Sequence, residues 1–245
     1  MRLLTYNIFW KIHDIKDDTN YCLKNNQNKC IENCREIILS LGKEKNELYP
    51  NYDFIALQET SIKHLKKINL PKDFIKNYKY KYSKVGPNTV ITLYHKKYTP
   101  IKTIKGNLSN LSDCRPYLIT FFKENIIHIN VHFPHHDFQL AFLKLFDKLP
   151  KNNKYKVIIC GDFNHEPNIK SLNYLFNPIK FIKNKKIKTC CKLYSSNKYS
   201  NNSDIIFTNI SKPSVYKTIN SKKYIINNIP FMSDHLPIYS KIPNN

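Results

Sequence analysis

Glycine is scarce in this chain, with 4 residues in 245, and this limits the phosphate-binding folds open to it. Neither G-x-G-x-x-G nor G-x-x-x-x-G-K-[ST] occurs, so the glycine-rich turn of dinucleotide-binding and P-loop folds is missing. Long apolar runs are missing too, because no stretch reaches the roughly 18 residues that a membrane span needs. We therefore expect neither a nucleotide-binding fold of those kinds nor a transmembrane segment.

Targeting and cross-linking signals are also weak. A strand-like run, Arg2 to Trp10, begins almost at the first residue and leaves no room for a signal peptide. The seven cysteines show no C-x-x-C spacing, and Cys30 and Cys34 lie among apolar residues at helical spacing. We interpret these two as buried core thiols, and we predict neither a zinc site nor a disulfide framework. Reduced thiols favour an intracellular location, in the cytoplasm or the nucleus.

Acidic residues are few: 18 Asp and Glu stand against 40 Lys and Arg, which gives a formal net charge of +22. Such a balance favours a polyanionic partner, either nucleic acid or an anionic membrane surface. A biased genome explains it as well, because Lys, Asn, Ile and Tyr, which have codons rich in A and T, are all abundant. Lys also outnumbers Arg, the usual residue for bidentate phosphate recognition. Charge alone supports a nucleic-acid partner only weakly.

Apolar residues make up 41% of the chain and aromatic residues 13%, enough for a substantial core. Short runs rich in Ile, Val, Phe, Tyr and Thr predict eight strands. They are Leu3–Ile8, Phe54–Gln58, Val90–His95, Tyr117–Phe122, Ile126–His132, Val157–Cys160, Asp204–Phe207 and Leu236–Lys241. Tyr78–Tyr82 and Ser214–Ile219 are weaker candidates.

Three segments carry apolar stripes at helical spacing, namely Cys30–Leu41, Asp137–Leu149 and Asn168–Phe176. The polar stretches Lys11–Lys29 and Ile182–Asn202 are interpreted as loops or insertions. Neither a repeat nor a linker is evident, so we predict one domain over residues 1–245. Many strands with few helices favour two sheets packed face to face, with the helices outside.

Polar residues recur where the predicted strands begin or end. They are Asn7, Glu59, His132, Asp162, Asn164, Asp204, Asp234 and His235. Taken singly, each has an ordinary explanation as a turn, a cap or a solvated group. Taken together, they could meet at one rim, where several carboxylates would repel one another unless a divalent cation bound. Oxygen ligands without a usable cysteine favour Mg2+ or Mn2+ over zinc.

Four strings carry a family resemblance. They are Thr5-Tyr6-Asn7-Ile8, Leu57-Gln58-Glu59, Gly161-Asp162-Phe163-Asn164 and Ser233-Asp234-His235-Leu236-Pro237. In their order and wide spacing they resemble the endonuclease/exonuclease/phosphatase superfamily, also called deoxyribonuclease-I-like. The resemblance implies an α/β fold, a four-layered α/β sandwich of two packed, mostly antiparallel β-sheets flanked by helices. It also implies a Mg2+-dependent phosphoesterase, and we expect a monomer.

The resemblance further implies a role for each residue of the set. Asn7 and Glu59 are similar to the metal-site Asn and Glu, and Asp234 could complete a second metal position. Asp162 would orient or deprotonate the attacking water, which Asn164 would help to hold. His235 would contact the scissile phosphate and Asp204 would orient it. Arg115 is similar to a phosphate-contacting Arg, and His132 matches a position where nuclease members carry His.

The substrate stays open at this point. Our first hypothesis is hydrolysis of nucleic-acid phosphodiester bonds, in DNA or RNA, with cleavage polarity undetermined. One alternative is a lipid or small-molecule phosphoesterase, for which Pro230–Met232 is the nearest candidate for an apolar surface loop. Another is a non-catalytic nucleic-acid-binding protein. The Tyr residues that lie between lysines in Tyr78–Tyr82 could stack on bases, but the alternation favours an ordinary half-buried strand.

Overall fold

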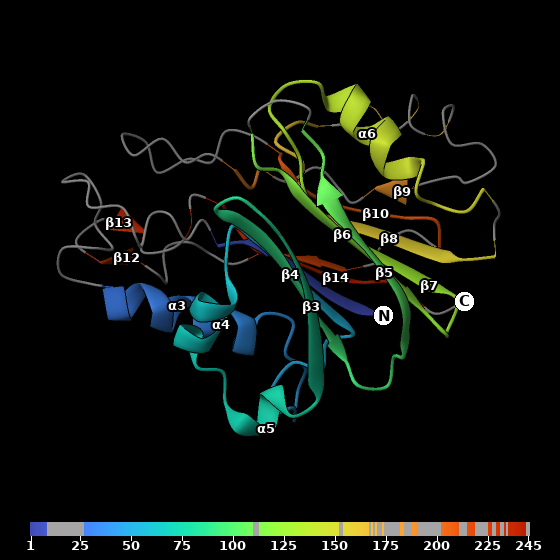
Figure 1. Cartoon of the computed structure of the whole chain (residues 1–245). Helices are drawn as coiled ribbons and strands as arrows, with labels where there is room; N and C mark the ends of the chain where they lie inside the picture. Colours follow the sequence, from blue (N-terminus) through green and yellow to red (C-terminus); the bar gives the residue numbers. More distant parts are fainter. Residues whose placement is uncertain are drawn as a thin grey trace.

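Two β-sheets pack face to face in the computed structural model, with helices on both outer faces (Figure 1). The structure describes residues 1–8, 27–109, 113–151, 154–166, 168, 170, 173, 182–183, 188–190, 202–210, 215–218, 225–226, 229–230, 233 and 235–243. The chain is therefore a four-layered α/β sandwich, as the sequence predicts.

The first sheet has six strands in the order β11-β14-β1-β2-β4-β3. The strands are β11 (Val215–Lys217), β14 (Ile238–Lys241), β1 (Arg2–Asn7), β2 (Phe54–Gln58), β4 (Asn88–His95) and β3 (Tyr78–Val85). Its central pair, β1 and β2, is parallel, and its other neighbours are antiparallel. The carboxyl ends of β1 and β2 consequently lie at the same edge of the sheet.

The second sheet repeats this plan in the order β5-β6-β7-β8-β10-β9. Its strands are β5 (Pro100–Asn107), β6 (Pro116–Phe122), β7 (Ile126–His132), β8 (Lys156–Asp162), β10 (Asp204–Thr208) and β9 (Ile182–Lys183). Here the central parallel pair is β7 and β8, flanked by antiparallel neighbours. A separate small hairpin pairs β12 (Ile225–Ile226) with β13 (Ile229–Pro230).

Helices α3 (Gln27–Ser40), α4 (Ile62–Ile68) and α5 (Lys72–Ile75) cover the first sheet, and α6 (Phe138–Phe146) covers the second (Figure 1). In α3, Cys34, Ile37 and Ile38 lie three and four residues apart, so one buried stripe faces the sheet. Helix α4 begins where the Ser61 side chain accepts a hydrogen bond from the backbone N–H of His64. No described helix is both long and apolar enough to cross a membrane.

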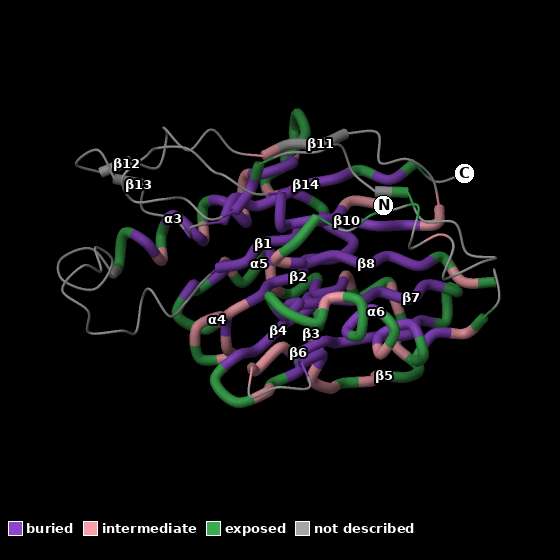
Figure 2. The backbone as a smooth tube through the Cα atoms, turned by 90° about the horizontal axis from the view of Figure 1, so that it is seen from above, coloured by how far each residue is buried: buried purple, intermediate pink, exposed green. Residues whose placement is uncertain are grey.

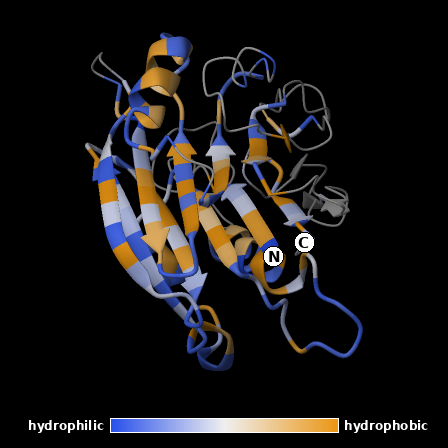
Figure 3. Ribbon diagram, turned by 90° about the vertical axis from the view of Figure 1, so that its right-hand side faces the viewer, coloured by the Kyte–Doolittle hydropathy of each residue, from blue (hydrophilic) through white to orange (hydrophobic). Residues whose placement is uncertain are grey.

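Side chains alternate between the two faces of each strand, which produces three apolar layers. Leu4 and Tyr6 of β1 pack under the helices, whereas Leu3 points between the sheets toward Phe54 and Ile158. Figure 3 shows this alternation of hydrophobic and hydrophilic residues along the strands. Figure 2 shows that β1, β2, β7 and β8 are buried along their lengths. The central strands thus hold their end residues rigidly.

The layer between the sheets changes from apolar to polar along the central strands. In β1 the inward residues run Leu3, Thr5, Asn7, and in β8 they run Ile158, Cys160, Asp162, all of them buried. The inward residues of β7 follow the same course, from Ile126 through His128 and Asn130 to His132. Because buried polar groups need partners, this gradient concentrates hydrogen-bonding side chains at one end of the sandwich.

The structure contains elements that the sequence did not reveal, namely β5, α4, α5 and the two-residue strands β9, β12 and β13, of which β9 lies at the start of the predicted loop Ile182–Asn202. Their segments are short or rich in lysine, so no apolar period identifies them. The expected helix Asn168–Phe176 lies mostly outside the described residues. The expectation of a half-buried Tyr78–Tyr82 is wrong in part: the strand forms, but Tyr80 is 46% exposed and Tyr82 40%. The reason is that β3 is the outermost strand of its sheet.

The expectation of reduced thiols also needs correction. Cys30 and Cys190 are both disulfide-bonded, whereas Cys34 and Cys160 are free thiols. Sequence spacing alone does not reveal which cysteines form disulfides. Burial raises the pKa of the Cys34 thiol to about 12, so Cys34 behaves as a core residue, as predicted.

Candidate active site

The two parallel strand pairs deliver their polar ends to one rim between the sheets. Asn7 ends β1, and His132 and Asp162 end β7 and β8, where they are paired in register. Asp204 begins the antiparallel strand β10 and lies opposite Asp162. Carboxyl ends of neighbouring parallel strands meet at one edge of a sheet, where ligands commonly bind. The fold therefore brings together residues as far apart in the sequence as Asn7 and His235, which are separated by 228 positions.

Asn7 lies at the centre of this cluster and is completely buried. Its side-chain Nδ2 donates to Asp162 Oδ2 at 2.8 Å and to Glu59 Oε1 at 3.2 Å. The same nitrogen lies 3.5 Å from His235 Nε2. One amide thus links two carboxylates and an imidazole that come from separate parts of the chain.

His132 and Arg115 form a further side of the cluster. His132 Nε2 lies 3.5 Å from Glu59 Oε1 and 3.6 Å from Asp162 Oδ2. Arg115 Nη1 lies 2.6 Å from the same imidazole nitrogen. Because Arg carries a fixed charge and a planar fork of donors, Arg115 donates to His132 Nε2 and places positive charge beside that imidazole.

His235 is held by Asp204 on its other side. His235 Nδ1 lies 2.9 Å from Asp204 Oδ2, while its Nε2 lies 3.6 Å from Asp162 Oδ2. A carboxylate acceptor at Nδ1 fixes the proton there and sets the ring orientation. The exchangeable nitrogen, Nε2, consequently faces the centre of the cluster.

Asp162 and Asn164 adopt a tight turn immediately after β8. The backbone N–H of Asn164 donates to Asp162 Oδ1 at 2.8 Å, and its side-chain Nδ2 donates to Phe133 O at 2.6 Å. Burial raises the pKa of the Asp162 carboxyl, and Asp204 raises it further against the opposing effect of His235. Glu59 and Asn164 both have left-handed backbone conformations, with φ of 48° and 55°. Such strain is concentrated at functional sites.

The side chains of this cluster fit a hard divalent cation. Ligand atoms of Glu59, His132 and Asp162 all lie within 4.8 Å of one another, and Asn7 adds an amide. Asp162 is 1% exposed, and a bound cation would offset the cost of burying its charge. A second group, Asp162, Asp204 and His235, has similar spacing, but there Asp204 already binds His235. The oxygen-rich first group is the better candidate for Mg2+ or Mn2+.

Thr189 and Cys190 also belong to the site, although the sequence gave no sign of it. Thr189 Oγ1 accepts from the backbone N–H of Asp204 at 3.1 Å, and Thr189 O accepts from Leu236 N at 2.7 Å. Cys190 Sγ lies 3.3 Å from His235 Nε2. These residues lie in a polar stretch without periodicity, which was predicted to be a loop.

Gln58 and Asn130 form a supporting layer beneath the cluster. Gln58 Nε2 donates to Asn130 Oδ1 at 2.7 Å, and Asn130 Nδ2 donates to Ile91 O at 2.9 Å. The two sheets are therefore joined by side-chain hydrogen bonds directly below the rim. Alternation in the sequence Ile126-Ile-His-Ile-Asn-Val-His132 is the signal that could have identified Asn130.

Asp234, the remaining predicted metal residue, lies outside the described residues. The other eight predicted residues are all part of the cluster: Asn7, Glu59, Arg115, His132, Asp162, Asn164, Asp204 and His235.

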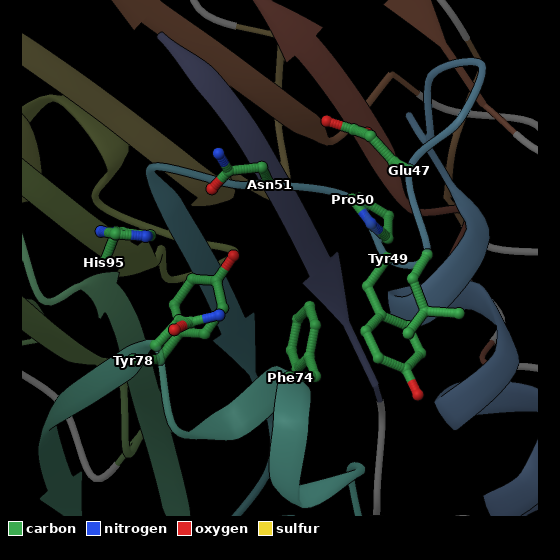
Figure 4. Close-up of a pocket in the computed structure, with 9 residues that line it drawn as sticks. Glu47, Tyr49, Pro50, Asn51, Phe74, Tyr78 and His95 are labelled. Atoms are coloured by element: carbon green, nitrogen blue, oxygen red, sulfur yellow. The ribbon is translucent and has the colours of Figure 1, made fainter.

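A cavity of about 400 Å3 lies elsewhere, at the far end of the first sheet (Figure 4). Its walls include Tyr49, Phe74 and Tyr78. The ring centroids of Tyr49 and Phe74 lie 5.8 Å apart, and those of Phe74 and Tyr78 lie 4.9 Å apart. His95 also lines it and ends β4, which runs antiparallel to β2. The cavity is thus remote from Glu59 and shares no residue with the polar cluster.

Comparison with known proteins supports this picture. A model described as "Endonuclease/Exonuclease/phosphatase family" matches residues 4–174. Protein L684 of Acanthamoeba polyphaga mimivirus is 26% identical over 273 residues, and this chain spans 51% of that relative's length. TDP2 of D. rerio, solved in complex with a single-strand DNA product, is 15% identical with a TM-score of 0.65, covering 98% of this chain and 97% of that one. A Bacteroides thetaiotaomicron protein of the same family name is 14% identical with a TM-score of 0.66, covering 98% and 96%.

Proposed function

Because the chain belongs to the endonuclease/exonuclease/phosphatase family, we propose that it is a metal-dependent phosphodiesterase that cleaves nucleic acid by attack of water. The observation that carries the proposal is the buried junction of Asn7, Glu59 and Asp162, with His235 facing it. Carboxylates, an amide and two imidazoles around one point are the groups that this chemistry requires.

In this proposal, Glu59 and the side-chain oxygen of Asn7 would hold the cation, with His132 and Asp162 beside them. Mg2+ or Mn2+ bound there supplies charge stabilisation to a phosphate oxygen. Asp162 accepts a hydrogen bond or a proton from the attacking water, since its raised pKa makes the carboxylate a stronger base. Asn164 fixes the Asp162 carboxylate through its backbone N–H. The water is thereby aligned for attack on phosphorus.

The imidazole side of the site stabilises the developing negative charge. His235 Nε2 is turned inward by the Asp204 hydrogen bond and, with the ring protonated, would donate to a non-bridging phosphate oxygen. Arg115, whose Nη1 lies 2.6 Å from His132 Nε2, would contact a neighbouring phosphate oxygen. Donors that are already oriented when the substrate arrives are worth about 10²–10³ in rate each.

A nucleic-acid substrate is favoured by charge. The formal net charge of +22 attracts a phosphate backbone and predicts binding that weakens steeply with salt. The D. rerio structure with a single-strand DNA product shows that a protein of similar fold binds such a ligand. For a lipid substrate, Phe231 and Met232, the candidate apolar loop, lie outside the described residues.

A substrate panel tests the proposal. Purified protein in Mg2+ or Mn2+ is offered single- and double-stranded DNA, poly(A) RNA, abasic DNA, a 5′-tyrosyl oligonucleotide and phosphoinositides. We expect cleavage of at least one nucleic acid, abolished by EDTA, restored by the metal and reduced about 10³-fold or more in Asp162→Asn. Cleavage of phosphoinositides alone, or activity in EDTA, would contradict the proposal.

A further inference from the structure

The two sheets end at a common edge that carries positive charge alone. Strands β3 and β5 are the outermost strands of their sheets and contact each other. Together they contain five lysines and no Asp or Glu. Figure 2 shows exposed and partly buried residues along both strands, in contrast to the buried central strands. We call the exposed residues Lys79, Tyr80, Tyr82, Lys84 and Lys105 the edge track.

Two tyrosine rings lie open to solvent on this edge. Tyr80 is 46% exposed and Tyr82 is 40% exposed, although Tyr78 of the same strand is buried. The Lys105 ammonium lies 4.7 Å from the centroid of the Tyr82 ring, so the two strands are bridged by a cation–π contact. Aromatic faces interleaved with lysines are the features with which proteins bind unpaired bases and their phosphates.

Both strands of the edge lead to the active site. The end of β5 contacts Arg115, because Asn107 Oδ1 accepts from the Arg115 backbone N–H at 2.9 Å. The turn after β3 leads to Asn88, whose side chain donates to Cys114 O at 2.7 Å. Arg115 in turn contacts His132 at the rim. A strand bound along the eight residues of β3, roughly 26 Å at 3.3 Å per residue, would therefore arrive at the cluster.

We propose that the edge track binds single-stranded nucleic acid and guides it toward the active site. This inference rests on the proposed function and adds the form of the substrate and its path. Unpaired bases offer their faces to Tyr80 and Tyr82, whereas bases in a duplex are already stacked. The lysines then hold the phosphates on either side of the rings.

Lysines on an edge strand have a second known purpose, which is to prevent pairing with the edge of another molecule. That purpose explains the lysine charge of the edge, but it gives the exposed tyrosines no role in binding nucleic acid. It predicts self-association rather than weaker nucleic-acid binding when the lysines are removed. The two explanations therefore separate in experiment.

The test measures binding of a fluorescent single-stranded oligonucleotide by anisotropy, with Asp162→Asn as the background so that no cleavage occurs. The stacking variant is Tyr80→Ala with Tyr82→Ala, and the charge variant replaces Lys79, Lys84 and Lys105 by Gln. The matched control replaces Lys43, Lys45 and Lys156 by Gln, three exposed lysines outside the track. Circular dichroism and gel filtration of each variant verify that it is folded and monodisperse.

We expect the stacking variant to weaken single-strand binding about 10-fold or more while changing duplex binding less than about 2-fold. The charge variant should lower the slope of log affinity against log salt by about 2, which is three contacts at ~0.7 each. The control triple variant should lower it by less than half of that. The proposal would be overturned if the charge variant and the control variant lowered the salt slope equally. It would also be overturned if the stacking variant bound the single strand as tightly as the parent.

Failure of the track and failure of the proposed function are distinguishable. The same substitutions are placed in the active enzyme and assayed on bis(p-nitrophenyl) phosphate, a small diester that cannot reach the track. If the track alone is wrong, oligonucleotide cleavage continues at the parental rate in the track variants. If the proposed function alone is wrong, the parent cleaves no nucleic acid although the track binds it in the anisotropy assay.

Discussion

At the residue scale, the positions of proton-carrying groups are set by neighbours that come from other strands. His235 owes its orientation to Asp204, and Asp204 is itself fixed by Thr189 Oγ1 through its backbone. Burial of Asp162 beside Asp204 raises the pKa of its carboxyl. A single substitution at a supporting position should therefore lower the reaction rate without removing any group that contacts substrate.

Asp204→Asn tests this arrangement. Losing the carboxylate at Nδ1 removes the negative charge that stabilises a protonated His235 imidazole, so Nε2 becomes a poorer donor and we expect kcat to fall about 10²-fold or more. KM should change less than about 3-fold, because the groups that contact phosphate remain. Steady-state kinetics on the cleaved oligonucleotide provide the measurement, with Asp147→Asn, an exposed carboxylate on the outer helix side, as the control. A kcat within about 3-fold of the parent would show that Asp204 does not position the imidazole.

The residues of the site were largely predictable because the strings that carry them lie at strand ends. Asn7, Glu59, Asp162 and His235 follow or precede runs of Ile, Leu and Val, so their placement follows from the strands. Thr189 and Cys190 were not predictable. Their segment has no apolar period, and only the fold shows that it returns to Asp204 and Leu236.

At the element scale, the central strand pairs place the site, and one glycine allows their closest approach. Gly161 has a φ of +143°, and an added Cβ would lie 2.0 Å from Val131 O, on the neighbouring strand β7. Side chains rarely adopt this backbone conformation, and the contact is with backbone that cannot move aside. Strands β7 and β8 would have to separate directly behind His132 and Asp162.

Gly161→Ala is accordingly expected to lower the free energy of unfolding by more than about 3 kcal/mol and to abolish cleavage. Urea unfolding and the oligonucleotide assay measure the two effects. Gly106→Ala is a suitable comparison, since its Cβ would meet only the Tyr117 side chain and no unusual φ is required. If Gly161→Ala lowered the free energy of unfolding no more than Gly106→Ala does, a special role for the close approach of strands β7 and β8 would be ruled out.

Most elements were predictable and a few were not, for a common reason. Strands β2 and β7 match the predicted Phe54–Gln58 and Ile126–His132 because they are buried runs of apolar residues. Strand β5, with the sequence Pro100-Ile-Lys-Thr-Ile-Lys-Gly-Asn107, is partly exposed and polar, so it carries no signal of burial. A strand is hard to predict from sequence when it forms because it pairs with a neighbouring strand and not because its own residues alternate or are apolar.

At the scale of the whole molecule, the polar layer between the sheets connects stability to pH. His128 is buried between the sheets, stacks on Phe54 with ring centroids 4.6 Å apart and contacts Cys160 Sγ at 3.4 Å. Burial lowers the pKa of its imidazole to about 3, from an ordinary 6.5. Between these values the unfolded chain binds a proton at His128 and the folded chain does not. Stability should thus fall as the pH falls from 6.5 toward 3.

Replacing His128 by Leu tests that dependence. The variant lacks the group, so its unfolding free energy should vary less with pH over this window, by up to about 1 kcal/mol per pH unit. The comparison uses urea unfolding from pH 4 to 8. Both proteins contain the same carboxylates, so their contribution cancels when the unfolding free energy of the variant is subtracted from that of the parent. Parallel curves for the two proteins would mean that His128 is protonated in the folded state as well.

The most direct test of the whole arrangement is titration of the protein with Mn2+, followed by calorimetry. The sandwich is proposed to bring Asn7, Glu59, His132 and Asp162 around one cation site. We predict that Glu59→Gln weakens Mn2+ binding 10-fold or more while thermal unfolding of the metal-free protein stays within a few degrees of the parent. Glu124→Gln, an exposed glutamate that accepts from Thr99 N, should bind Mn2+ like the parent. Undiminished Mn2+ binding by Glu59→Gln would contradict a cation site at this junction.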